Sequence, residues 1–224
     1  MKQIALDIGL AGGPTLENFF PGPNTFALSH LKLWAASSTR SPVSTYLWGP
    51  QGSGKTHLLE AVRGALREMG AECGWMDASQ AVWPEFHENW AAVLLDDVHL
   101  YGAEQQQRAF NWFVNAQANQ LAVLASGLWP VAQLPLREDV RTRLGWGHIF
   151  ELQLLNEADR RAVLRQRADA RGVFLSDEVM DFILRRFSRD LGSLMQLLDQ
   201  LDGYALQTRR AVTVPLIRSM LESS

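Results

Sequence analysis

The chain has 224 residues, of which 47% are apolar and 20% are charged, and its formal net charge is −3. This balance is typical of a folded globular protein and excludes disordered, collagen-like and coiled-coil classes. No apolar run approaches the ~18 residues that span a bilayer, and the N-terminus lacks the pattern of a signal peptide, so we expect a cytoplasmic protein that contacts no membrane.

The charge is distributed unevenly along the chain. Residues 1–136 carry 7 basic and 11 acidic side chains, whereas residues 137–224 carry 14 arginines and 13 acidic side chains. Strong binding to duplex DNA needs many phosphate contacts and usually shows as a clear basic excess, so we do not expect DNA to be the main partner by direct contact, and any direct DNA contact stays open. The single cysteine, Cys73, permits no internal disulfide and is expected to be a small buried residue.

Residues 16–155 have the pattern of an α/β domain. Asn24 is a good N-cap for a helix whose apolar residues recur every three or four positions. Helices are expected at 55–69 and 104–118, between apolar runs that do not alternate with polar residues. Such runs indicate a parallel sheet that is covered on both faces. The expected strands are Thr45–Trp48, Cys73–Met76, Ala92–Leu95, Leu121–Ala125 and His148–Leu152.

The remainder of the chain reads as helical. Helices are expected at about 157–171, 176–188 and 190–207, and a short helix is expected to begin near Thr213. The sequence therefore predicts three parts: an N-terminal peptide and linker over 1–15, a nucleotide-binding α/β domain over 16–155 and a small all-α lid over 156–224.

The most specific motif is a phosphate-binding loop at residues 49–56. Gly49-Pro50-Gln51-Gly52-Ser53-Gly54-Lys55-Thr56 matches G-x-x-x-x-G-K-[ST] and stands between an expected strand and an expected helix. The glycines allow backbone amides to surround a phosphate, the helix N-terminus adds positive charge, Lys55 reaches the β and γ phosphates, and the Thr56 hydroxyl holds Mg²⁺. The predicted nucleotide-binding residues of the loop are Gly49, Gly52, Ser53, Gly54, Lys55 and Thr56.

Two acids follow the third expected strand. Asp96 would lie at the carboxyl edge of the sheet beside the loop and would hold Mg²⁺ with Thr56. Asp97 is placed to orient or deprotonate an attacking water. Alone, two acids after a strand are also typical of a turn.

These motifs, with the helical tail, resemble the AAA+ family of ATPases with a five-stranded parallel sheet and a helical lid. Leu16-Glu17-Asn18-Phe19-Phe20, with Gly22 and Asn24, is similar to the adenine-side segment of the bacterial replication initiator DnaA. Arg141-Thr142-Arg143-Leu144-Gly145-Trp146-Gly147 is similar to that family's R-x-R-F-G-W-G box. DnaA continues into a DNA-binding domain for which no residues remain here, so the chain most resembles a regulatory inactivator of DnaA within the same family.

The resemblance implies roles for several residues. Arg143 matches the arginine finger that one subunit extends to its neighbour's γ-phosphate, with Arg141 as a second candidate and a surface salt bridge as the alternative. Arg189 resembles the arginine sensor that opens a lid helix and would contact the nucleotide, as would Asn24; a plain surface arginine is the alternative for Arg189. The polar sensor that the family usually has at position 127 is missing, since this residue is Gly127, although Ser126 is a candidate substitute.

The resemblance also gives a role to Gln3-Ile4-Ala5-Leu6-Asp7-Ile8. In a clamp-binding peptide, Gln3 would bond in a polar pocket while Leu6 and Ile8 fill an apolar groove on the DNA polymerase sliding clamp (the beta subunit). The alternation of apolar residues would also suit a half-buried strand.

The function implied is a regulator that carries ADP or ATP with Mg²⁺, binds the DNA-loaded clamp and stimulates ATP hydrolysis by DnaA, so that re-initiation of replication is repressed. The protein would contact DNA indirectly, through the clamp, and would be associated with the nucleoid in this way. Its own ATP hydrolysis would be slow. The identity of the resident nucleotide and the formation of a homodimer stay open. The alternatives are a helicase loader or motor driven by its own hydrolysis and, more weakly supported, a small-molecule phosphoryl transferase.

Overall fold

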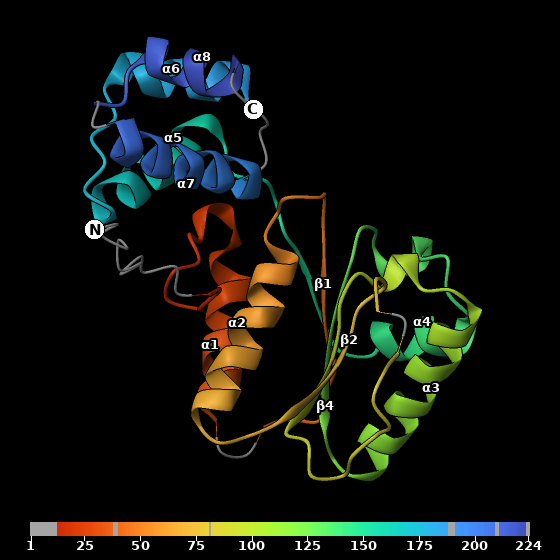
Figure 1. Cartoon of the computed structure of the whole chain (residues 1–224). Coiled ribbons are helices and arrows are strands. Elements are labelled where there is room, and N and C mark those ends of the chain that lie inside the picture. The colour runs from red at the N-terminus through yellow and green to blue at the C-terminus, as the bar shows by residue number, and fades with distance from the viewer. Residues whose placement is uncertain (1–12, 38–39, 81, 188–190, 209–210, 223–224) are drawn as a thin grey trace. The chain divides into compact units, whose positions relative to one another are not determined.

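The computed structural model describes residues 13–37, 40–80, 82–187, 191–208 and 211–222 (Figure 1). By its internal contacts the described chain divides into two compact units, with the boundary between Leu154 and Leu155. None of the helices in these ranges is long and apolar enough to cross a membrane.

The first unit is built around a five-stranded sheet in which every neighbouring pair is parallel. The strand order is β2-β3-β4-β1-β5. This confirms the predicted fold class. The strands are β1 (Thr45–Trp48), β2 (Cys73–Met76), β3 (Ala92–Leu95), β4 (Ala122–Gly127) and β5 (His148–Glu151).

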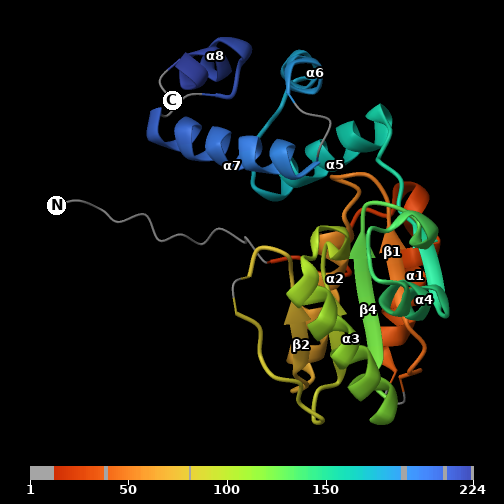
Figure 2. The same ribbon diagram turned by 90° about the vertical axis from the view of Figure 1, so that its right-hand side faces the viewer.

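Helices cover both faces of this sheet (Figures 1 and 2). On one face lie α1 (Thr25–Ala36) and α2 (Lys55–Glu68), and on the other lie α3 (Ala103–Ala118) and α4 (Glu138–Gly145). Three short 3-10 helices join these elements: η1 (Gly22–Asn24), η2 (Val98–Leu100) and η3 (Val131–Gln133).

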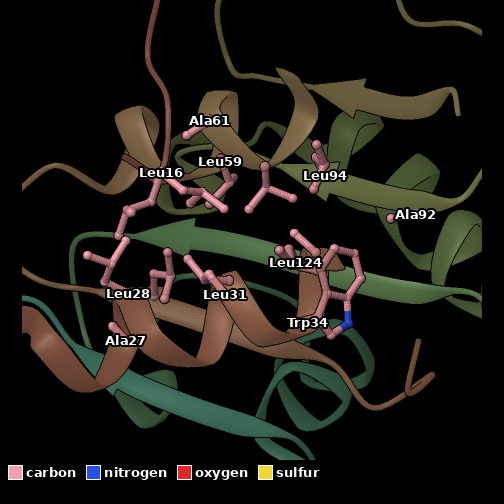
Figure 3. Packing of buried hydrophobic residues seen from close by; sticks show 14 of the residues in the cluster. Leu16, Ala27, Leu28, Leu31, Trp34, Leu59, Ala61, Ala92, Leu94 and Leu124 are labelled. Atoms are coloured by element: carbon pink, nitrogen blue, oxygen red, sulfur yellow. The ribbon is translucent and has the colours of Figure 1, made fainter. Parts of the chain in front are cut away.

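Successive strand residues pack into two different cores. Leu94 and Leu124 join Leu31 of α1 and Leu59 of α2 in the core of one face (Figure 3). Their neighbours in the strands, such as Val93, pack against α3 on the other face. Because helices cover both faces, the central strands β3 and β4 are buried along their whole length, which explains why their sequences do not alternate; the edge strand β5 is largely exposed. Burial also raises the pKa of the Cys73 thiol to about 11, as suits a residue packed against the core.

Two features of this unit were not predicted. The eight-residue helix α4 was missed, and it buries only Val140 and Leu144 among charged neighbours. The described residues between β2 and β3 contain no helix; instead Trp90 of this connection packs edge-on against Trp112 of α3, with ring centroids 5.0 Å apart. Aromatic side chains therefore cover the part of the sheet that a crossover helix usually covers.

The second unit contains four helices in its described residues, α5 (Glu157–Ala170), α6 (Asp177–Arg186), α7 (Leu191–Thr208) and α8 (Val214–Glu222). Its own core includes Leu164, Met180, Ile183, Leu198 and Ile217. The Ser176 hydroxyl accepts a hydrogen bond from the Val179 amide and caps α6, as the sequence predicted. The all-α composition of this unit agrees with the predicted lid.

Candidate functional site: a phosphate loop facing two aspartates

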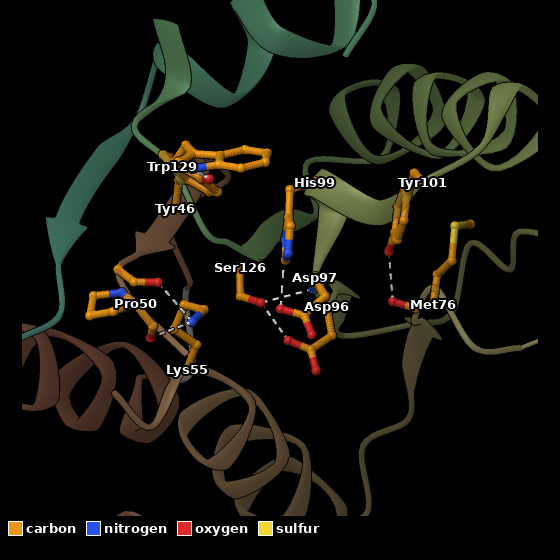
Figure 4. Close-up of polar contacts among 11 residues, drawn as sticks. Tyr46, Pro50, Lys55, Met76, Asp96, Asp97, His99, Tyr101, Ser126 and Trp129 are labelled. Atoms are coloured by element: carbon orange, nitrogen blue, oxygen red, sulfur yellow. Dashed lines mark hydrogen bonds and ion pairs between the residues drawn. The ribbon is translucent and has the colours of Figure 1, made fainter. Parts of the chain in front are cut away.

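The candidate site lies where β1, β3 and β4 end. The strands are parallel and β4 pairs with both β1 and β3, so their carboxyl ends meet at one edge of the sheet. The loop Gly49–Thr56 follows β1, and Asp96 and Asp97 follow β3. Ser126, the second-last residue of β4, lies between them (Figure 4). The topology therefore brings the two strongest sequence motifs together, as predicted.

The glycines of the loop are required by its shape. Gly52 and Gly54 have φ values of 79° and 94°, in the left-handed region that favours glycine. A Cβ at Gly54 would stand 2.6 Å from Cε2 of Phe19, and one at Gly49 would clash with the carbonyl oxygen of Leu152. The loop is thus a backbone cradle against which Phe19 packs closely.

Lys55 is buried in the cradle as the first residue of α2. Its Nζ donates hydrogen bonds to the carbonyl oxygens of Gly49, at 2.9 Å, and Pro50, at 3.0 Å. Burial lowers the pKa of Lys55, while the nearby carboxylates of Asp97 and Asp96 oppose that shift. The hydroxyl of Ser53 is buried and has no hydrogen-bond partner among the described residues. The loop therefore holds polar groups directed inward that a phosphate would satisfy.

Asp96 and Thr56, the two residues predicted to bind Mg²⁺, are hydrogen-bonded to each other through their side chains. Burial raises the pKa of Asp96, while hydrogen bonds from the hydroxyls of Ser126 and of the exposed Thr56 oppose that shift. The Ser126 hydroxyl also donates to Oδ1 of Asp96. Among the described residues no cluster of three or more His, Cys, Asp or Glu side chains could hold a metal by itself. One hydroxyl and one carboxylate suit Mg²⁺, which is usually shared with phosphate oxygens and water.

Asp97 is more accessible than Asp96. Its backbone is left-handed, with φ 48° and ψ 47°, and its amide donates to Oγ of Ser126 at 2.9 Å. Its side chain is 39% exposed, and Oδ1 lies 3.8 Å from Nδ1 of His99. The two acids thus differ in exposure: Asp96 is buried, whereas the Asp97 side chain is partly exposed.

The position of the missing polar sensor is occupied by another side chain. Gly127 ends β4, and a Cβ there would clash with the hydroxyl of Tyr46 on β1. That hydroxyl donates to the Trp129 carbonyl oxygen at 2.7 Å, and burial raises the Tyr46 pKa far above its usual range. Ser126 is fully buried and bonded to both aspartates, so it organises them rather than reaching outward. Sequence reasoning found neither contact.

Asn24 makes structural contacts in this fold. Its Nδ2 donates to the Gln153 carbonyl oxygen at 3.0 Å, and its Oδ1 accepts from the Gln153 amide at 2.8 Å. Asn24 does occupy the N-cap position of α1, as predicted, but its side chain is buried and makes no capping hydrogen bond to that helix. Both polar atoms of the Asn24 side chain are thus hydrogen-bonded to the Gln153 backbone. The contact of Asn24 with a nucleotide stays a prediction.

The two arginines of the 141–147 box lie on α4. The guanidinium of Arg143 packs over the Phe110 ring, 5.2 Å from its centroid, and donates to Oε1 of Gln117 at 2.9 Å. Arg141 is half-buried and has no side-chain partner among the described residues. The contacts of Arg143 are thus with α3, outside the phosphate loop of its own chain. The predicted residues Gln3, Leu6, Ile8 and Arg189 lie outside the described residues.

The geometry can be compared with known proteins. Residues 157–221 match the family model of the Hda lid domain. Domain III of the replication initiator DnaA from Thermotoga maritima is 20% identical, with a TM-score of 0.79, and the match covers 93% of this chain and 95% of that one. AMPPCP-bound DnaA from Aquifex aeolicus is 22% identical, with a TM-score of 0.69 and coverages of 87% and 66%.

A more distant likeness is to the RuvB Holliday junction branch migration motor of Thermotoga maritima, at 15% identity and a TM-score of 0.68, over 94% of this chain and 72% of that one. The fold is the α/β AAA+ fold of DnaA domain III, and residues 157–221 match the lid domain of Hda. The chain is therefore similar to Hda-like, DnaA-related AAA+ proteins, in agreement with the resemblance stated from the sequence.

Proposed function

We propose that the chain binds ADP or ATP with Mg²⁺ through the loop Gly49–Thr56 and Asp96. The glycine cradle, the buried Ser53 hydroxyl and the inward Lys55 amine all fit a nucleoside phosphate. A similar fold in Aquifex aeolicus DnaA carries AMPPCP, which supports the same ligand class here. The bound phosphates would supply the remaining oxygen ligands for the Mg²⁺ that Thr56 and Asp96 hold.

We further propose that this protein hydrolyses its own nucleotide slowly. Asp97 has the placement of a residue that orients water. The end of β4, however, offers no free polar side chain, because Tyr46 fills the space at Gly127 and Ser126 is bonded to both acids. Nucleotide would then serve mainly as a resident cofactor.

The function best supported is regulation of DnaA. In this proposal the protein, tethered to the DNA-loaded sliding clamp by Gln3, Leu6 and Ile8, presents Arg143 to ATP held by DnaA and stimulates its hydrolysis. Re-initiation of replication would then be repressed. The observation that carries this proposal is the Hda lid match over residues 157–221 of a chain whose fold is that of DnaA domain III. The side-chain contacts of Arg143 with α3, outside its own phosphate loop, are consistent with action on a partner.

A helicase loader or motor remains the second candidate. The complete phosphate loop with two acids, and the likeness to the RuvB motor, favour it. Steady-state ATP turnover by the protein alone and with single-stranded DNA separates the two, because a motor would turn over appreciably without DnaA.

The deciding experiment is single-turnover hydrolysis of ATP preloaded on DnaA, with clamp-loaded DNA and this protein. Arg143→Ala should remove most of the stimulation, because a guanidinium stabilises the charge on the transferring phosphoryl group, an effect worth about 10³ to 10⁵ in rate in GTPases. Arg143→Lys should restore little, since lysine lacks the planar fork that holds two oxygens.

Arg108→Ala provides the matched control. Arg108 lies on α3 and pairs with Glu85 at 3.1 Å, so its loss removes a surface arginine without touching α4. This control should stimulate DnaA like the wild type. Equal rates for wild type and Arg143→Ala would remove Arg143 from the mechanism, and Arg141→Ala would then test the second arginine of the box.

A further inference from the structure

His99 stands over the candidate site without a role in the proposals above. The left-handed backbone at Asp97 turns η2 back over the carboxyl edge of the sheet, and the His99 side chain points down toward Asp97 (Figure 4). Nδ1 of His99 lies 3.8 Å from Oδ1 of Asp97, and the side chain is only 11% exposed.

Packing, rather than hydrogen bonding, fixes the imidazole ring. It meets the Trp129 ring edge to face, with centroids 5.6 Å apart and an interplanar angle of 79°. The Trp129 backbone is in turn held by the Tyr46 hydroxyl. Nδ1 of His99 is nevertheless buried and has no hydrogen-bond partner among the described residues. A buried polar nitrogen that is held in place yet unpaired indicates a missing ligand.

The charge around His99 decides which form of the ring is present. Burial lowers its pKa, and the charge of Lys55 acts in the same direction, while Asp97 and Asp96 oppose the shift. The net lowering favours a neutral ring at pH 7. The carboxylate facing Nδ1 favours the tautomer that carries the proton on this nitrogen. His99 thus presents a neutral N–H donor to the site.

The polar side chains around the end of β4 already make hydrogen bonds. The Ser126 hydroxyl donates to Asp96 and accepts from the Asp97 amide, and the Tyr46 hydroxyl donates to the Trp129 carbonyl oxygen. Gly127 has no side chain to offer. Among the described groups around the end of β4, Nδ1 of His99 is buried without a hydrogen-bond partner and lies 3.8 Å from Oδ1 of Asp97.

We propose that His99 donates this hydrogen bond to the terminal phosphate of a bound nucleoside triphosphate, and so distinguishes the triphosphate from the diphosphate. The inference rests on the proposed nucleotide binding. In this arrangement a histidine on η2 supplies the polar contact that the glycine at the end of β4 cannot make. The ring's fixed position means that little entropy is lost when the bond forms.

The test is calorimetric binding of Mg²⁺–AMPPCP and of ADP to the full chain and to variants at His99. His99→Ala should weaken AMPPCP binding about ten- to hundredfold, the range of a hydrogen bond to a charged group, and change ADP binding less than about twofold. His99→Asn places an amide N–H close to the position of Nδ1, whereas His99→Gln reaches the position of Nε2. Asn should therefore restore AMPPCP binding better than Gln.

His87→Ala is the matched control, because His87 is an exposed histidine in the connection between β2 and β3. It should bind both nucleotides like the wild type. The inference is overturned if His99→Ala changes AMPPCP and ADP binding by the same factor, or if Asn restores no more than Gln. Wild-type protein that binds neither nucleotide would instead refute the proposed function, so the two failures are distinguishable. If His99→Ala does not fold, as its melting temperature will show, the comparison of Asn with Gln decides.

Discussion

Lys55 is the residue on which nucleotide binding should depend most strongly. Its amine is already inside the backbone cradle, bonded to two loop carbonyl oxygens that are poor substitutes for phosphate. Lys55→Ala should therefore weaken both ADP and ATP binding about a hundredfold or more, since a charge-assisted contact is lost. Isothermal titration calorimetry on the purified protein measures this directly.

Lys32→Ala controls for the loss of one positive charge, since Lys32 is an exposed residue of α1. It should bind nucleotide normally. Unchanged affinity in Lys55→Ala would mean that the loop does not hold phosphate, and the nucleotide-binding assignment would fall with it.

Three residues of the site show what a sequence pattern leaves out. Loop glycines, Lys55 and the two acids could be predicted because their spacing is local and follows from the chemistry of phosphate and magnesium. The roles of Ser126, Tyr46 and His99 arise from contacts between different strands and turns, and no local spacing encodes them. The same holds for Asn24, whose hydrogen-bond partner is Gln153.

At the scale of elements, α2 has one glycine at its start and one in its interior, and the two differ in whether the structure has room for a side chain. Gly54 precedes the helix with φ 94° and leaves no room for a Cβ beside Phe19. Gly64 lies inside the helix, where an added Cβ would lie 3.9 Å from the Pro14 carbonyl oxygen, an ordinary van der Waals distance. One position needs glycine, and the other does not.

Gly64→Ala should therefore raise the free energy of unfolding by about 0.5 to 1 kcal/mol, because alanine loses less conformational freedom in a helix. Gly54→Ala should lower it by about 1 kcal/mol or more, through backbone strain and the clash with Phe19, and should weaken nucleotide binding. Urea denaturation followed by circular dichroism gives both values. A pair of variants with equal stability would show that the loop tolerates a side chain and is not the tight cradle described.

The helices and strands could be predicted where their buried residues form a continuous apolar run or a regular helical period. All five strands were located from apolar runs, because a sheet covered on both faces requires them. Only β4 extends further than predicted, by two residues at its end, where Ser126 and Gly127 pair with Leu47 and Trp48. The helix α4 has just two buried apolar residues in eight, too few for a recognisable period.

For the whole molecule, each unit has its own core, and the lid carries the match to the Hda family. The proposed attachment to the clamp rests on residues 3–8, which precede the described residues and a Gly12-Gly13-Pro14 connection. This arrangement predicts that attachment and folding are separable.

The double substitution Gln3→Ala with Leu6→Ala tests that separation. It should abolish binding to the sliding clamp in surface plasmon resonance, because the polar contact and an apolar anchor of the proposed peptide are both removed. The melting temperature and ADP affinity should stay at wild-type values, since a detached peptide contributes little to the folded state. If the segment were instead a strand in a core, truncation of Leu6 would lower the free energy of unfolding by about 2 to 5 kcal/mol. A large fall in melting temperature, with clamp binding lost only as the protein unfolds, would therefore identify a structural strand. Loss of clamp binding by a fully stable variant, which no longer stimulates DnaA on clamp-loaded DNA, would establish the tether.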